Sequence, residues 1–146
     1  MTSALIDAGP LIALFDRDDH FHVPVKNFMM RYKGELTTTW PVITNAVQGL
    51  DFNPKVRTDL MTWIDRGGIR LINLDDRHLP YLMELFQMNP DAGIGLPAAT
   101  VIVVSKFAGI RNVITLDLER YIYRKGKTAR FTNLLTPYLS DESSTH

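Results

Sequence analysis

The sequence predicts an α/β domain of three layers, in which a central, mostly parallel sheet is flanked by helices. Short apolar runs alternate with longer segments of helical period, which is typical of βαβ units. In addition, Asp7 and Asp117 each follow directly after an apolar, β-rich run. Ligands of open parallel sheets bind outside the carboxyl ends of the strands, so both acids are expected to point into one cleft.

In the first half of the chain, strands are expected at residues 4–7 and 36–39. Gly9-Pro10 predicts a turn that leads into a short helix ending at Phe15. Apolar residues at three- and four-residue spacing predict a helix over 24–31, and a proline in the first turn favours another over 41–50. This half therefore contributes two strands and the helices that follow them.

In the second half, a helix is expected over 55–66 and is ended by Gly67-Gly68. A third strand is predicted at 69–74, a helix at 78–88 and a fourth strand at 112–116. The segment 97–107 contains four consecutive β-branched residues but is predicted to be a buried helix, because of its length, its leading proline and the glycine beyond its end.

Length and composition predict one globular domain over 1–139, followed by a disordered tail at 140–146. The chain has no cysteine, which excludes disulfides and thiol catalysis. Its apolar stretches are far shorter than the roughly 20 residues of a membrane span, and no signal peptide is recognisable. A cytoplasmic protein with no membrane partner is therefore expected.

Sixteen basic and sixteen acidic residues cancel, so the whole molecule has no net field that would attract nucleic acid. Basic residues outnumber acidic ones between Leu118 and Arg130. This segment is either a modest basic patch for RNA or an ordinary solvated surface, and the sequence leaves both open.

Several segments together resemble PIN domains, particularly those of VapC-type toxin ribonucleases. The most specific is LIDAGPLIALF at 5–15 with DRDDHFH after it, and segments 38–45, 91–109 and 113–117 agree in order and spacing. The resemblance covers residues 4 to about 135. It implies a PIN-like fold, an endoribonuclease that depends on Mg²⁺ or Mn²⁺, an RNA substrate, an antitoxin-like protein partner and a homodimer.

PIN nucleases hold their metals with four acidic residues, and this chain matches only two of them. Asp7 corresponds to the first acid and Asp117 to the last, so the resemblance implies that these two are metal ligands. Asn45 stands where a glutamate is expected, and Ala98 where an aspartate is expected. Gly95 falls on a position that often carries a secondary acid. The resemblance thus implies a depleted acidic site.

The depleted site leaves two functions open. Hard cations need charged oxygen ligands, so the loss of two acids should abolish a second metal. One Mg²⁺ can still be held by one or two carboxylates with water and substrate phosphate, and the Asn45 amide is a possible neutral ligand or a solvent-facing residue. Thr115 matches a Ser/Thr position of the family and is either a polar site residue or an ordinary strand residue. The chain is therefore a weak ribonuclease or a non-catalytic module that binds RNA or protein.

Other candidate features were weighed against simpler explanations. His20 and His22 have no third ligand at useful spacing, so surface histidines are expected. Trp40 and Trp63 are expected to be packing residues, because no basic residues interleave with aromatic ones around them. A phosphotransfer domain of the dehalogenase kind is disfavoured because Gly9 stands where its second acid is needed.

Overall fold

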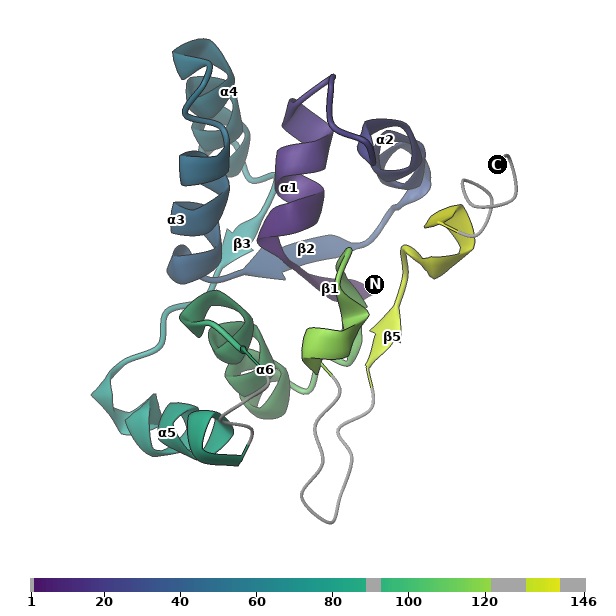
Figure 1. The fold of residues 1–146 in the computed structure, drawn as a ribbon. Coiled ribbons are helices and arrows are strands. Elements are labelled where there is room, and N and C mark those ends of the chain that lie inside the picture. Colours follow the sequence, from purple (N-terminus) through teal and green to yellow (C-terminus); the bar gives the residue numbers. More distant parts are fainter. Residues whose placement is uncertain (1, 89–92, 122–130, 140–146) are drawn as a thin grey trace.

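The computed structural model describes residues 2–88, 93–121 and 131–139, which form an α/β domain (Figure 1). Its sheet has five strands, all parallel, in the order β3-β2-β1-β4-β5. β1 is therefore central, with β2 and β4 on either side. The strands are β1 (Ser3–Ile6), β2 (Glu35–Thr38), β3 (Arg70–Leu71), β4 (Asn112–Ile114) and β5 (Thr132–Asn133).

Helices cover both sides of this sheet, which confirms the predicted three layers (Figure 1). On one side are α1 (Ala8–Phe15), α2 (His22–Arg31), α3 (Trp40–Gly49) and α4 (Pro54–Asp65). On the other side are α5 (Leu79–Met88) and α6 (Leu96–Ala108). There are also two short 3₁₀ helices, η1 (Asp76–His78) and η2 (Leu118–Tyr121), and a short helical turn at 136–139.

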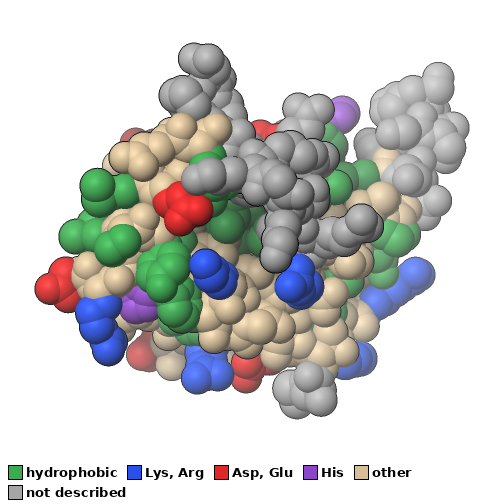
Figure 2. Space-filling view, turned by 90° about the horizontal axis from the view of Figure 1, so that it is seen from below, with side chains coloured by type: hydrophobic (Ala, Val, Ile, Leu, Met, Phe, Trp, Pro, Cys, Tyr) green, Lys and Arg blue, Asp and Glu red, His purple; other side chains and the backbone are tan. Residues whose placement is uncertain are grey.

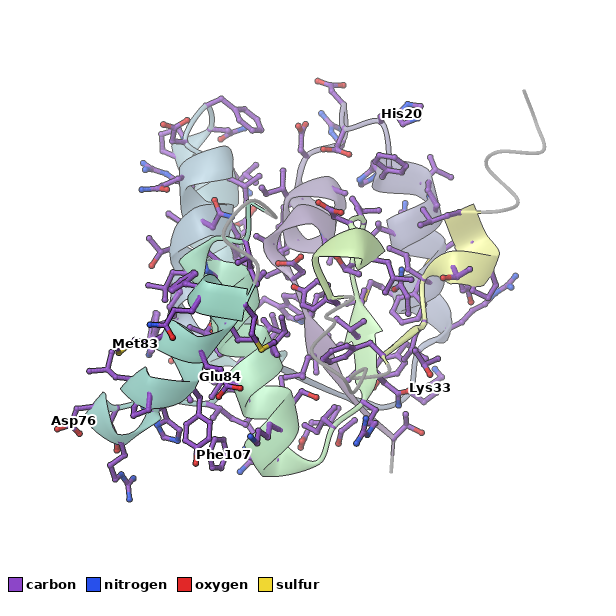
Figure 3. The ribbon with its side chains drawn as sticks, turned by 60° about the horizontal axis from the view of Figure 1, so that its bottom comes forward. His20, Lys33, Asp76, Met83, Glu84 and Phe107 are labelled. Atoms are coloured by element: carbon purple, nitrogen blue, oxygen red, sulfur yellow. The ribbon has the colours of Figure 1, made fainter. Side chains whose placement is uncertain are left out.

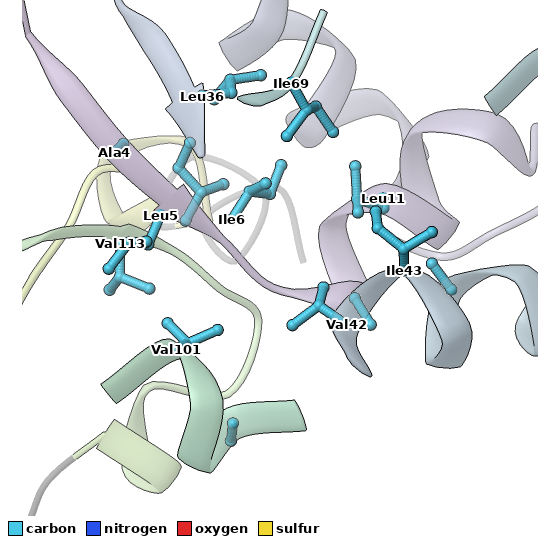
Figure 4. Packing of buried hydrophobic residues seen from close by; sticks show 14 of the residues in the cluster. Ala4, Leu5, Ile6, Leu11, Leu36, Val42, Ile43, Ile69, Val101 and Val113 are labelled. Atoms are coloured by element: carbon cyan, nitrogen blue, oxygen red, sulfur yellow. The ribbon is translucent and has the colours of Figure 1, made fainter. Parts of the chain in front are cut away.

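The core explains why β1 is a continuous apolar run. Leu5 and Ile6 are both fully buried, since helices cover both faces of the sheet. Val101 of α6 lies beneath β1, and Leu11 of α1 lies beside Ile43 of α3 (Figure 4). Burial of such side chains contributes about 1.5–3 kcal/mol each, so the core fixes the position of the chain end that follows β1.

The segment with consecutive β-branched residues is helical, as predicted. All residues from Ala98 to Val104 in α6 are buried. Since every face of the helix contacts protein in this region, the apolar residues need no helical spacing. Gly109 ends the helix with a φ of 70°, which is the left-handed conformation expected of a residue at this position.

Several predicted boundaries were wrong. Gly9-Pro10 is not a turn before a helix, because α1 already begins at Ala8 and Asp7 caps it. Helices α2, α3, α4 and α6 begin one or two residues before their predicted starts, so that their prolines lie within the first turn.

The sheet also differs from the prediction at its edges. The third strand is only Arg70–Leu71. It is short because its neighbour β2 ends at Thr38 and offers few backbone partners beyond that residue. The Ile72 N–H still donates to the Thr38 carbonyl at 2.9 Å. The fifth strand was missed, since two residues carry no periodicity. Most of the basic segment 118–130 and the whole tail 140–146 lie outside the described residues.

The two tryptophans have different environments. Trp63 packs against Phe15 with ring centroids 5.8 Å apart, as predicted. Trp40 is 47% exposed, so the expectation that it is a packing residue was wrong. It is the first residue of α3, and only Thr39 separates it from the end of β2.

His20, His22 and an exposed apolar surface lie outside the region of Asp7. His20 lies in the loop before α2 and is exposed (Figure 3), and the His22 Nδ1 is 2.7 Å from the Ala13 carbonyl oxygen. Seen from below, hydrophobic side chains lie among separate basic and acidic side chains (Figure 2). Met83 and Phe107 are among the exposed large hydrophobic residues (Figure 3). Among the described helices, none is long and apolar enough to cross a membrane.

Candidate functional site

Asp7 is the one residue between the end of the central strand β1 and the start of helix α1. Its backbone N–H donates to the carbonyl of Ile114 at 3.0 Å, which extends the pairing of β1 with β4 by one residue. Its side-chain Oδ1 accepts from the Ala8 N–H at 2.8 Å and so caps α1. The carboxylate is thus held at the carboxyl end of β1 and at the positive end of a helix dipole.

Thr115 connects the two predicted acids. Its buried hydroxyl donates to Asp7 Oδ2 at 3.1 Å and accepts from the backbone N–H of Asp117 at 3.0 Å. A single oxygen therefore links the chain ends that follow β1 and β4, two neighbouring strands. The structure brings Asp7, Thr115 and the backbone of Asp117 together at one edge of the sheet.

Asn133 in β5 supports this arrangement and was not predicted. Its Oδ1 accepts from the Thr115 N–H at 3.2 Å, and its Nδ2 donates to the Thr115 carbonyl at 2.9 Å. The same Oδ1 accepts from the Leu135 N–H at 3.2 Å. The amide thus pairs with Thr115 as a backbone peptide would, after the β4–β5 ladder has ended. No spacing in the sequence indicates this role, because it depends on the strand order.

A hollow of about 540 Å³ opens beside Asp7. It lies where α3 approaches the start of α6, and the buried hydroxyls of Thr39 and Thr100 join these elements at 2.7 Å. Its described lining is Asp7, Trp40, Pro41, Thr44, Asn45, Gln48, Gly93, Gly95, Leu96, Pro97 and Ala98. Asp117 is not part of that lining.

The hollow contains every position at which the resemblance to PIN domains expects a missing acid. Asn45, Gly95 and Ala98 line it together with Asp7. Asn45 is exposed on α3, and the Ala98 methyl group is only 2% exposed at the start of α6. Three segments that are far apart in the sequence therefore meet beside the first acid.

A cation at this edge of the sheet would find few charged ligands among the described residues. Within the described part of the chain, no three His, Asp or Glu side chains cluster closely enough to hold a metal ion. Asp7 and Asp117 remain, together with the Thr115 hydroxyl and the Asn45 amide. Mg²⁺ is satisfied by one or two carboxylates when water and phosphate complete its shell, but two adjacent cations need more negative charge.

A second hollow, of about 440 Å³, adjoins the first. Trp40, Pro41 and Leu96 line both hollows, so these residues form the wall between them. The second hollow is also lined by Asp75, whose pKa is lowered to about 2 by hydrogen bonds from Arg77. Asp75 is therefore ionised at neutral pH, and neither hollow has a described Lys or Arg in its lining.

Comparison with known proteins identifies the fold. The chain superposes on the sarcin-ricin loop cleaving toxin VapC20 of Mycobacterium tuberculosis with a TM-score of 0.73, at 14% identity, over 80% of this chain and 92% of that one. It superposes on a chain of a toxin-antitoxin complex from Klebsiella pneumoniae with a TM-score of 0.58, at 17% identity, over 81% and 89% of the two chains.

The protein PAE2754 from Pyrobaculum aerophilum gives a TM-score of 0.50 at 19% identity, over 97% of this chain and 98% of that one. No family model and no curated protein matches the sequence. These identities are low, so the likeness concerns the path of the backbone and the order of its elements. With five parallel strands and helices on both sides, the chain has the fold of a VapC-like PIN domain.

Proposed function

We propose that this protein is a PIN-like endoribonuclease that cleaves RNA slowly and uses one Mg²⁺ or Mn²⁺ ion bound at Asp7 and Asp117. The observation that carries the proposal is the hydrogen-bonded series from Asp7 through the Thr115 hydroxyl to the Asp117 N–H. It lies at the carboxyl edge of a sheet that superposes on VapC20, which is described as cleaving the sarcin-ricin loop.

The roles of the residues follow from their positions. Asp7 and Asp117 would hold the cation, which supplies positive charge to neutralise a scissile phosphodiester. Thr115 fixes the Asp7 carboxylate through its hydroxyl, and the start of α1 stabilises the negative charge. Asn45 offers a neutral amide and Ala98 offers no ligand atom, so affinity for the cation and the cleavage rate are both low.

A cleavage assay tests this function. Purified protein is expected to cut single-stranded RNA slowly with Mg²⁺ or Mn²⁺ and not at all with EDTA. Asp7→Asn should abolish cleavage, because it removes one of two charged ligands. Asp65→Asn, at an exposed position of α4, is the matched control and should cleave as the natural chain does. Cleavage that survives Asp7→Asn would show that another protein or another site is responsible.

The second candidate function is a non-catalytic module that binds RNA or protein. It is favoured by the lack of a three-ligand cluster within the residues described. Calorimetry separates the two functions, because this candidate requires no heat of Mg²⁺ or Mn²⁺ binding at millimolar concentrations. A saturable heat that Asp7→Asn and Asp117→Asn both remove would support the ribonuclease.

The proposed function also includes a protein partner, a dimeric state and a cellular location. The Klebsiella pneumoniae structure is a toxin-antitoxin complex, which supports an antitoxin-like partner for this chain. We also propose a homodimer and a cytoplasmic location. Sedimentation velocity of the purified chain tests the dimer, and co-purification from its native cells tests the protein partner.

A further inference from the structure

We propose that the hollow between α3 and α6 binds an unpaired nucleobase, which stacks on Trp40 and makes hydrogen bonds with Asn45 and Gln48. This inference rests on the proposed RNA function and deepens it. It assigns recognition of the base to residues of this chain that occupy the space left by the missing acids. It does not require a metal ion.

The first argument is the geometry of α3. Trp40, Thr44 and Gln48 are spaced by four residues, and Asn45 lies beside them, so one face of the helix carries all four. All four line the hollow that begins at Asp7. An aromatic ring followed by two amides along one helix face matches a flat ligand that stacks on its plane and hydrogen-bonds at its edge.

The second argument is that these groups are available. The Trp40 side chain is 47% exposed and forms part of the wall between two hollows. Within the described residues, the side-chain amides of Asn45 and Gln48 have no hydrogen-bond partner in the protein. The Thr44 hydroxyl, in contrast, is used internally, because it donates to the Trp40 carbonyl at 3.0 Å.

The third argument is charge. Asp7 is the single ionisable side chain in the described lining, which contains no Lys or Arg to hold a phosphate. Without the proposed metal ion, a phosphate in this hollow would be repelled by Asp7, whereas a neutral base would not. The hollow volume of about 540 Å³ also accommodates a purine. A base held here would lie beside the Asp7 carboxylate, next to the proposed cleavage site.

The experiment uses the fluorescence of Trp40 to report binding of a base. The chain has two tryptophans, so Trp63→Phe leaves Trp40 as the single indole. This variant is titrated in EDTA with an oligoribonucleotide of adenosines and with a chain of equal length that has no bases. The adenosine oligomer should quench Trp40 emission, and the abasic chain should not. In Trp40→Phe, where only Trp63 reports, emission should stay constant.

Affinity is measured in parallel by anisotropy of a dye-labelled adenosine oligomer. Trp40→Ala should weaken binding by about 5- to 150-fold, as expected for the loss of one stacked base. Gln48→Ala should also weaken it, while Gln87→Ala, an exposed glutamine of α5 outside the hollow, should not. Circular dichroism establishes that each variant is folded.

The outcomes separate this inference from the proposed function. Equal binding of the abasic chain, or unchanged affinity in Trp40→Ala, would overturn base recognition and leave the RNA function in place. Absence of binding to either chain would overturn base recognition as well, and the cleavage assay with Mg²⁺ or Mn²⁺ would then decide the RNA function separately.

Discussion

Asp7 has two roles that depend on different properties of its side chain. As the cap of α1 it needs an oxygen that accepts from the Ala8 N–H, and as a proposed metal ligand it needs a negative charge. An asparagine retains the first property and lacks the second. The position therefore allows the structural and functional contributions of one residue to be separated.

We predict that Asp7→Asn is nearly as stable as the natural chain, whereas Asp7→Ala loses about 1 kcal/mol of unfolding free energy through loss of the cap. Urea unfolding followed by circular dichroism measures both. If Asp7→Asn were as destabilised as Asp7→Ala, the negative charge itself would stabilise the fold, and the cleavage test would need another variant.

Asn133 supports the site through its two hydrogen bonds to the backbone of Thr115. We predict that Asn133→Ala lowers the unfolding free energy by roughly 1–3 kcal/mol, because the buried N–H and carbonyl of Thr115 lose their partners. Asn112→Ala, which removes one hydrogen bond to the Ser3 carbonyl, is the matched control and should lose less. Equal losses in the two variants would argue against the special role of Asn133.

At the scale of elements, α3 and α6 decide where the site is. Their first turns meet beside Asp7, and the hydrogen bond between Thr39 and Thr100 holds them together. Gly109 ends α6 in the left-handed conformation, which glycine adopts more readily than any other residue.

We predict opposite effects at two glycines. Gly109→Ala should destabilise the protein by about 1 kcal/mol, because alanine is strained at a φ of 70°. Gly9→Ala, within α1, should be neutral or slightly stabilising, since its added carbon would meet Leu116 at an ordinary 3.5 Å. Thermal unfolding of the two variants checks the sign of each change. A stable Gly109→Ala protein would mean that α6 ends differently in solution.

At the scale of the whole molecule, the proposed loss of two acids can be tested by restoring them. We predict that Asn45→Glu combined with Ala98→Asp is less stable than the natural chain without metal, because Ala98 is buried and the added carboxylates repel Asp7. Millimolar Mn²⁺ should then raise its melting temperature more than that of the natural chain, since a ligand that binds only the folded state stabilises it.

Thermal unfolding with and without Mn²⁺ measures this difference, and Asn45→Gln with Ala98→Ser provides a neutral control of similar size. An equal response to Mn²⁺ in all three proteins would contradict the placement of the missing acids at Asn45 and Ala98.

Much of the fold could be predicted from the sequence, because a strand that is buried on both faces of the sheet appears as a continuous apolar run. The apolar runs at β1 and β4 and the position of Asp7 after β1 follow from residues that are close together in the chain. The edge strands and the helix starts were less well predicted, since a two-residue strand has no periodicity and prolines are tolerated throughout a first turn.

The sequence by itself determined that this chain is an α/β domain with two acids at strand ends, and its resemblance to PIN domains predicted an amide and a methyl group in place of two other acids. Only the tertiary structure decided that Thr115 links the two strand ends, that Asn133 pairs with Thr115, and that Trp40 is exposed beside Asp7. The physical reason is that these contacts join residues up to 108 positions apart, so they depend on strand order and helix packing, which no local pattern records.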